Sequence, residues 1–142
     1  MGRYKQIDHT ADIAVSVSGS NVEDLFQTAS RAWRQIVMGN SEIAGVESQD
    51  FTLRSESLEE LLVECLSELN YLLIVKHWIF QDYSNLHITR LSSDYKLTAR
   101  ISGEPLRKNK HRIELEIKAV TFHQMNIRKA MRHLETIIIF DI

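Results

Sequence analysis

The chain has 142 residues, of which 44% are hydrophobic and 25% charged, and its formal net charge is -2. This length and composition fit a globular protein, and we expect residues 1–142 to form a single domain around one hydrophobic core. The near-neutral charge excludes a globally basic nucleic-acid binder, and no apolar run approaches the roughly 20 residues that span a bilayer, so no membrane association is expected.

The only cysteine is Cys65, so no disulfide can form within the chain. The absence of disulfides fits a reducing compartment. The first residues carry no apolar segment of the kind found in signal peptides. These features predict a cytoplasmic protein.

The first predicted elements are a strand and a helix. Apolar and small polar residues alternate over residues 13–19, which predicts a half-buried strand. Apolar residues then recur at helical spacing over residues 22–37, with Asn21 as the predicted N-cap and Gly39 as the stop.

A short strand over residues 46–53 and a second helix over residues 58–73 follow. Ser57 and Glu60 form a capping-box pattern at the start of this helix. Its apolar stripe is broad and contains Cys65, whose thiol we expect to be buried and unreactive, because burial raises the pKa of a thiol.

In the second half of the chain, apolar residues recur at every second position. Strands are predicted over residues 86–91, 95–101, 113–119, 125–128 and 134–142, with a hairpin turn at residues 92–94. The run from Ile137 to Phe140 is continuously apolar, which is typical of a strand buried on both faces. We therefore expect an α+β fold, in which two amphipathic helices pack on mixed β-sheets in the order β-α-β-α followed by several strands.

Polar side chains concentrate just before the first predicted strand, at Asp8, His9 and Asp12, and again at the C-terminal Asp141 and Ile142. Aspartate and histidine near a strand end are often turn formers. If the two ends meet, however, Asp12, Asp141 and the terminal carboxylate converge as anions. An oxygen-only ligand set suits Ca²⁺ or Mg²⁺, with Mn²⁺ as a further alternative.

Lys118 and His123 lie near the end of the predicted strand 113–119. Each is either a solvated surface residue or part of a site. Two basic clusters, residues 107–112 and 128–133, are expected in hairpin loops. They are either solvated turns or contacts for RNA phosphates or for an acidic partner surface. The sequence has no glycine-rich phosphate loop, no zinc-ligand spacing and no serine nucleophile elbow.

The chain resembles the archease family over essentially its whole length. Four blocks carry the resemblance in the family's order and spacing: Asp8-His9-Thr10-Ala11-Asp12-Ile13, Leu61-Leu62-Val63 with Leu66-Ser67-Glu68-Leu69, Lys118-Ala119-Val120-Thr121-Phe122-His123, and Phe140-Asp141-Ile142. Four blocks together are far more specific than any single motif.

The resemblance implies a non-catalytic activator of the tRNA-splicing RNA ligase, a GTP- and Mn²⁺-dependent enzyme that joins 2′,3′-cyclic-phosphate or 3′-phosphate ends to 5′-hydroxyl RNA ends. Such activators promote guanylylation of the ligase and its multiple turnover, and any RNA contact would be indirect. The resemblance also implies a divalent cation, Ca²⁺ first, with Mn²⁺ or Mg²⁺ as alternatives. Its ligands would be Asp12, Asp141 and the terminal carboxylate of Ile142, and Lys118 would take part in activation.

Asp8, His9 and His123 would lie around these ligands without being ligands themselves. The chain departs from the family pattern at Gln124, where glycine is common, at Cys65, where tryptophan is common, and over residues 76–82. None of these departures changes a proposed metal ligand.

Two alternatives to the activator stay open: a metal-dependent phosphoesterase, and a general RNA-binding or chaperone module. Salt-sensitive RNA affinity that depends on Lys108, Lys110 and Arg112 would favour the module.

Overall fold

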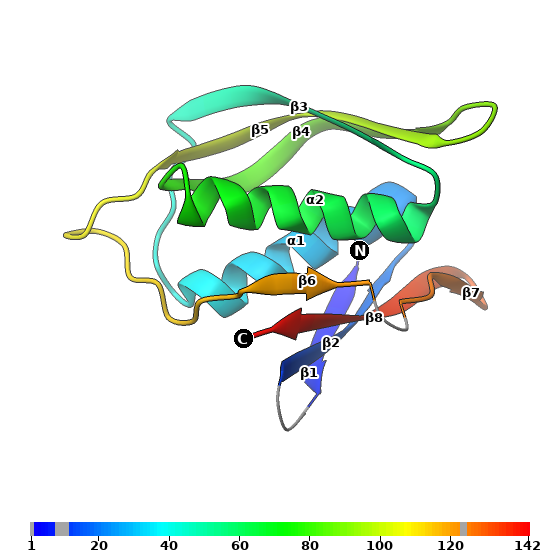
Figure 1. Cartoon of the computed structure of the whole chain (residues 1–142), viewed down its shortest axis with the longest axis horizontal. Helices are drawn as coiled ribbons and strands as arrows, with labels where there is room; N and C mark the ends of the chain where they lie inside the picture. The colour runs from blue at the N-terminus through cyan, green and yellow to red at the C-terminus, as the bar shows by residue number, and fades with distance from the viewer. Residues whose placement is uncertain (1, 8–11, 123–124) are drawn as a thin grey trace.

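The computed structural model describes residues 2–7, 12–122 and 125–142 and shows three layers (Figure 1). Two helices lie between a five-stranded sheet and a three-stranded sheet. The α+β class predicted from the sequence is confirmed. The described strands pair only in antiparallel fashion, so the predicted mixed sheets are wrong. No strand lies beside the next strand connected to it through a helix, and such a crossover is what makes a neighbouring pair parallel.

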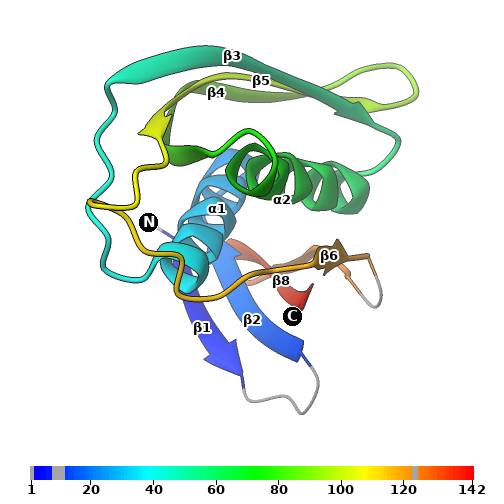
Figure 2. The same ribbon diagram turned by 60° about the vertical axis from the view of Figure 1, so that its left-hand side comes forward.

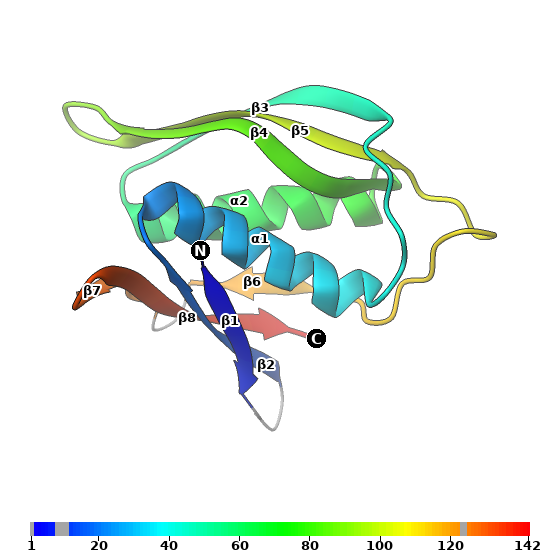
Figure 3. The same cartoon turned by 180° about the vertical axis from the view of Figure 1, so that it is seen from behind.

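The five-stranded sheet joins the two ends of the chain (Figure 3). Its members are β1 (Arg3–Ile7), β2 (Asp12–Gly19), β6 (Ala119–Thr121), β7 (Arg128–Ala130) and β8 (His133–Asp141). The order is β1-β2-β8-β6, and β7 pairs with the other half of β8. The second strand and the last strand therefore lie side by side in the middle of the sheet.

The three-stranded sheet has the order β3-β5-β4. Its strands are β3 (Glu47–Ser55), β4 (Trp78–Arg90) and β5 (Tyr95–Pro105). The last two form a long hairpin around the predicted turn at residues 92–94, and its tip projects beyond the helices (Figure 1). This hairpin covers the opposite face of the helical layer from β2 and β8.

The two helices are α1 (Val22–Met38) and α2 (Leu58–Ile74). Both predicted N-caps are confirmed: the Asp24 N–H donates to the Asn21 side chain at 2.8 Å, and the Glu60 N–H donates to Ser57 Oγ at 3.1 Å. Gly39 ends α1 with a φ of 56°, a left-handed conformation in which glycine is favoured. Among the helices that the structure describes, none is long and apolar enough to cross a membrane.

The core lies between the helices and the inner faces of both sheets, and it contains a polar cluster around Tyr83. Cys65 is fully buried, which raises the pKa of its thiol to about 11 and supports the predicted unreactive thiol. The Tyr83 hydroxyl lies 2.6 Å from Ser30 Oγ and 3.0 Å from Cys65 Sγ. This cluster joins both helices to β4.

β8 is covered on one face only, so the prediction of a strand buried on both faces is wrong. Ile138 and Phe140 are fully buried, whereas Ile137 is 48% exposed. Both helices pack on the same side of the five-stranded sheet (Figure 2), and the other side has no covering layer among the described residues. In the apolar run, Ile138 and Phe140 therefore face the core, whereas Ile137 faces outward.

Two further strand predictions need correction, and one strand was missed. The predicted strand 113–119 is a strand only from Ala119 to Thr121. The preceding residues are extended but cross the end of α1, where the Glu114 N–H donates to the Val37 carbonyl at 2.8 Å instead of to a neighbouring strand. Residues 125–127 are not a strand, and the pairing begins at Arg128, in a hairpin that turns at Met131 with a φ of 53°. β1 was not predicted, because its side chains are exposed and show no apolar alternation.

Candidate functional site

Asp12 and Asp141 lie directly opposite each other where β2 and β8 end. Opposite residues of an antiparallel pair have Cα atoms about 4.5–5.5 Å apart and present their side chains on the same face. Strand alternation puts both carboxylates on the face opposite the buried Val15 and Ile138, which is the side without helices. The hypothesis that the two ends of the chain meet is confirmed.

A third strand completes this end of the sheet. Ala119 of β6 lies opposite Asp141 on the edge that β2 does not use, and the Lys118 N–H donates to the Asp141 carbonyl at 2.8 Å. Ile142 follows Asp141 and is 39% exposed. Strand pairing thus brings three of the four sequence blocks that carry the family resemblance to one end of the sheet.

This end has the chemistry that a hard divalent cation requires. Like charges directly opposite each other destabilise a sheet, and a cation between the carboxylates removes the repulsion. Carboxylate oxygens are the usual ligands of Ca²⁺ and Mg²⁺. Within residues 2–7, 12–122 and 125–142, no three His, Cys, Asp or Glu side chains are grouped as metal ligands. The predicted set uses only Asp12 and Asp141 as side chains and takes its third ligand from the terminal carboxylate of Ile142, which is a main-chain group.

Several predicted residues lie outside the part of the chain that the structure describes. Asp8, His9 and Thr10 belong to residues 8–11, and His123 and Gln124 form the other gap. The predicted places of Asp8, His9 and His123 around the ligands remain predictions. Lys118 is described, and its side chain is exposed.

A buried amide holds the backbone next to Lys118. Asn70 of α2 is 9% exposed, and its Nδ2 donates to the Ile117 carbonyl at 2.8 Å. Its Oδ1 accepts a hydrogen bond from Trp33 Nε1 of α1 at 3.0 Å. The sequence analysis did not single out Asn70, although one signal was available: it is a polar residue between Leu69 and Leu72 in the buried stripe of a helix.

A groove of about 510 Å³ runs beside this contact, between the second half of α2 and residues 116–120. Polar groups line it at Ser67, Asn70 and Lys118, and the aromatic ring of Tyr71, 43% exposed, lines it from α2. The groove leaves open space on the α2 side of the backbone that leads into β6.

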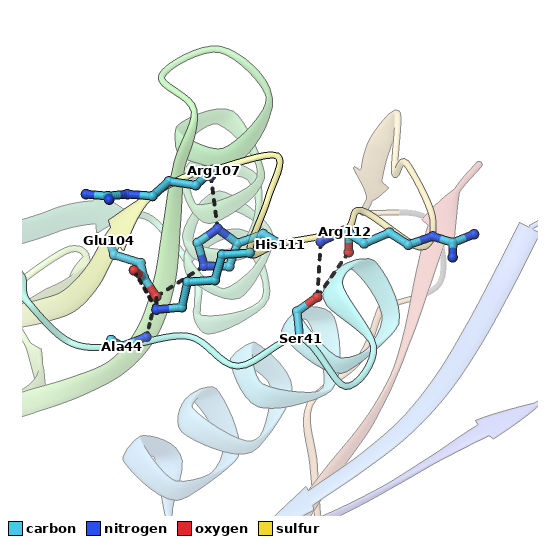
Figure 4. Close-up of polar contacts among 7 residues, drawn as sticks. Ser41, Ala44, Glu104, Arg107, His111 and Arg112 are labelled. Atoms are coloured by element: carbon cyan, nitrogen blue, oxygen red, sulfur yellow. Dashed lines mark hydrogen bonds and ion pairs between the residues drawn. The ribbon is translucent and has the colours of Figure 1, made fainter.

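Lys110 and His111 of the basic cluster 107–112 bind a buried carboxylate within the protein (Figure 4). Glu104 is 3% exposed, and its carboxylate accepts hydrogen bonds from the Ala44 N–H and from Lys110 Nζ, the latter at 2.9 and 3.0 Å. His111 Nδ1 accepts from the Arg107 N–H at 3.0 Å, so Nε2 is the nitrogen that donates to Glu104, 3.1 Å away. The bonds from Ala44 and Lys110 lower the pKa of Glu104 to about 2. This cluster holds the start of the segment that connects β5 of one sheet to β6 of the other.

The second basic cluster, residues 128–133, is also paired in part. Arg128 Nε lies 3.3 Å from a carboxylate oxygen of Glu135, its cross-strand neighbour in β8. These ion pairs reduce the positive charge that either cluster could offer to an RNA backbone.

Comparisons with known proteins identify the family of the chain. Residues 4–142 match the model described as "Archease protein family (MTH1598/TM1083)". Protein archease of Methanosarcina barkeri is 34% identical over 140 residues, covering 99% of this chain and 96% of the relative. Protein archease of Pyrococcus abyssi is 31% identical over 129 residues, covering 91% and 90%.

Solved structures give the same result for the fold. The solution structure of Methanobacterium thermoautotrophicum protein 1598 matches with a TM-score of 0.83 at 26% identity, over 98% of both chains. The crystal structure of a Thermotoga maritima archease, described as a possible chaperone, matches with a TM-score of 0.63 at 25% identity, over 97% of this chain and 96% of that one. The resemblance seen in the four sequence blocks is confirmed, and the chain belongs to the archease family.

Proposed function

We propose that this protein is a non-catalytic, cytoplasmic accessory protein that activates a tRNA-splicing RNA ligase. In this proposal it promotes guanylylation of the ligase and allows the enzyme to turn over repeatedly. The active part is the end of the five-stranded sheet that carries Asp12, Asp141, Ile142 and Lys118.

The observation that carries the proposal is the direct cross-strand pairing of Asp12 with Asp141, beside the peptide group of Lys118. Two carboxylates on one uncovered face form an acidic end, and Lys118, directly before β6, adds a positive charge at the same end of the sheet. A cluster that combines both signs at the rim of a protein suits contact with nucleotide phosphates and the metal ions that accompany them.

Asp12, Asp141 and the terminal carboxylate of Ile142 would hold a divalent cation, Ca²⁺ first, and fix it at the rim. When bound, the cation would offset two of the three carboxylate charges and offer its remaining coordination positions to phosphate oxygens. Lys118 would lie against the same phosphates as a point charge. The sheet supplies a rigid support for these groups, because β2 and β8 pair over their whole length.

Two alternatives are less well supported. A metal-dependent phosphoesterase needs a general base beside the metal, and the described ligand end offers only the carboxylates that would be metal ligands. An RNA-binding module would use Lys110, but the structure directs its ammonium group to the buried Glu104.

The test is a ligation assay with purified ligase, GTP, Mn²⁺ and RNA ends in excess over enzyme. We expect the wild-type protein to convert single turnover to multiple turnover and Asp12→Ala to abolish this effect while the protein stays folded. Asp50→Ala is the matched control, because Asp50 is an exposed strand aspartate on the other sheet, paired with Arg100. Full stimulation by folded Asp12→Ala would contradict the proposal.

The same preparation separates the alternatives. The isolated protein is incubated with phosphoesters and Mn²⁺ or Ca²⁺, and turnover without a ligase would indicate an enzyme. RNA binding is measured at two salt concentrations with Lys108, Lys110 and Arg112 intact and neutralised. Salt-sensitive affinity that is lost on neutralisation would favour the RNA-binding module.

A further inference from the structure

Asn70 is a buried polar side chain in the most apolar part of the molecule. Leu66, Leu69 and Leu73 surround its position in α2 and are all at most 1% exposed. A buried amide destabilises a fold unless its groups are hydrogen-bonded. Both partners of Asn70 come from other elements, namely the Trp33 indole of α1 and the Ile117 carbonyl.

These partners fix the orientation of the Asn70 amide. An indole N–H can only donate and a carbonyl can only accept, so Oδ1 must face Trp33 and Nδ2 must face Ile117. The amide therefore joins α1, α2 and the segment before β6 in one defined geometry.

The peptide group between Ile117 and Lys118 is held on both sides. Its carbonyl accepts from Asn70 Nδ2 at 2.8 Å, and its N–H donates to the Asp141 carbonyl at 2.8 Å. One planar peptide thus connects the middle of α2 with the backbone of a proposed metal ligand. The Ile117 side chain is 1% exposed, while Lys118 points its charge outward.

We propose that Asn70 is a positioning residue, which sets Lys118 and Asp141 at a fixed separation. This inference rests on the proposed function. Residues 113–117 belong to no strand, and a groove lies on the α2 side of this backbone. Loss of the Asn70 bond therefore leaves the Lys118 N–H bond to Asp141 in place and frees the carbonyl side of the peptide.

The first experiment needs no ligase. Amide hydrogen exchange of Lys118 is measured by NMR in wild type, Asn70→Leu and Asn70→Asp. Leucine keeps the side-chain volume but removes both bonds, whereas aspartate keeps the acceptor for Trp33 and removes the donor to Ile117. Loss of one such hydrogen bond should speed exchange of the Lys118 amide about tenfold in both variants.

The matched control is Tyr83→Phe, which removes another buried polar contact between the same two helices, to Ser30 and Cys65, that makes no bond to the Ile117–Lys118 peptide group. Tyr83→Phe should lower the global stability of the protein without removing a hydrogen bond of the Ile117–Lys118 peptide group. Two results would overturn the inference, whatever the ligase assay gives. One is an equal rise in Lys118 amide exchange in Tyr83→Phe, and the other is unchanged Lys118 exchange in both Asn70 variants.

The second experiment is a double-mutant cycle in the ligation assay with Asn70→Leu, Lys118→Ala and the double variant. We expect Asn70→Leu to reduce stimulation several-fold in the wild-type background and to have no further effect once Lys118 is alanine. Tyr83→Phe should stimulate like wild type. Full stimulation by an Asn70→Leu protein with fast Lys118 exchange would refute the positioning role. If the wild-type protein gives no stimulation, the proposed function fails, and the exchange experiment still decides the role of Asn70 in holding Lys118.

Discussion

For the Asp12–Asp141 pair, we predict that Asp141→Asn changes the stability of the protein in opposite directions with and without a divalent cation. Asp141→Asn removes one of two like charges that face each other across β2 and β8. At a separation of about 5 Å, two unit charges repel by about 1 kcal/mol in water and about 3 kcal/mol at an effective dielectric constant of 20. Because Asp141 is exposed, the lower value applies.

In EDTA, Asp141→Asn should therefore be more stable than wild type by about 1 kcal/mol, or about 2–4 °C in Tm. With Ca²⁺ the order should reverse. A ligand at 100 times its Kd stabilises the folded state by about 2.7 kcal/mol, and a variant that has lost a ligand gains much less.

The assay is thermal unfolding followed by circular dichroism, with and without Ca²⁺. Asp50→Asn on the other sheet is the matched control, because it removes a carboxylate paired with Arg100, 2.6 Å away, and should keep the full Ca²⁺ shift. If Asp141→Asn shows the wild-type Ca²⁺ shift and no gain in EDTA, the carboxylates neither repel nor share a cation, and the metal proposal is wrong.

Three other predictions follow from the same structure. Ile138→Ala should cost about 2–5 kcal/mol in urea unfolding, whereas its half-exposed neighbour Ile137→Ala should cost about 1 kcal/mol; equal losses would contradict a sheet covered on one face. The pKa of Glu104 is lowered to about 2, so its stabilisation is present above the unfolded pKa of about 4.5 and is lost as the pH falls toward 2. Glu104→Gln should accordingly be less stable at pH 7, and urea midpoints should show a shallower loss between pH 5 and pH 2. One glycine added after Ile142 should weaken Ca²⁺ binding, measured by calorimetry, without changing the Tm in EDTA.

The helices and their ends could be predicted from the sequence because their signals are local. Asn21, Ser57 and Gly39 act within a few residues of the helix they cap, so no knowledge of the rest of the fold is needed. The meeting of Asp12 with Asp141 could be proposed from chemistry, since a group of anions needs a common partner. Its register, with the two residues directly opposite each other, needed the structure.

The errors have a common cause, which is that alternation reports burial and not strand pairing. Residues 113–118 alternate in sequence, and burial increases from the exposed Ile113 to the buried Ile117, yet their backbone bonds to Val37 at the end of α1 and to Asn70. β1 pairs fully with β2 but is exposed along its length, so it leaves no apolar pattern. Asn70 was missed because a contact between a helix and a distant backbone carbonyl has no sequence period.

The central place of β8 has a consequence for how the protein forms during synthesis. Strands β3, β4 and β5 and helix α2 occupy one continuous stretch, so this half can assemble as soon as that stretch has left the ribosome. β2 can pair with β1 as soon as both are made, but the partner of its other edge lies almost a full chain length later, and contacts between such distant segments form slowly. The Asp12–Asp141 pair would thus be among the last features to form, and a chain interrupted before β8 would leave one edge of β2 unpaired and would lack the acidic end.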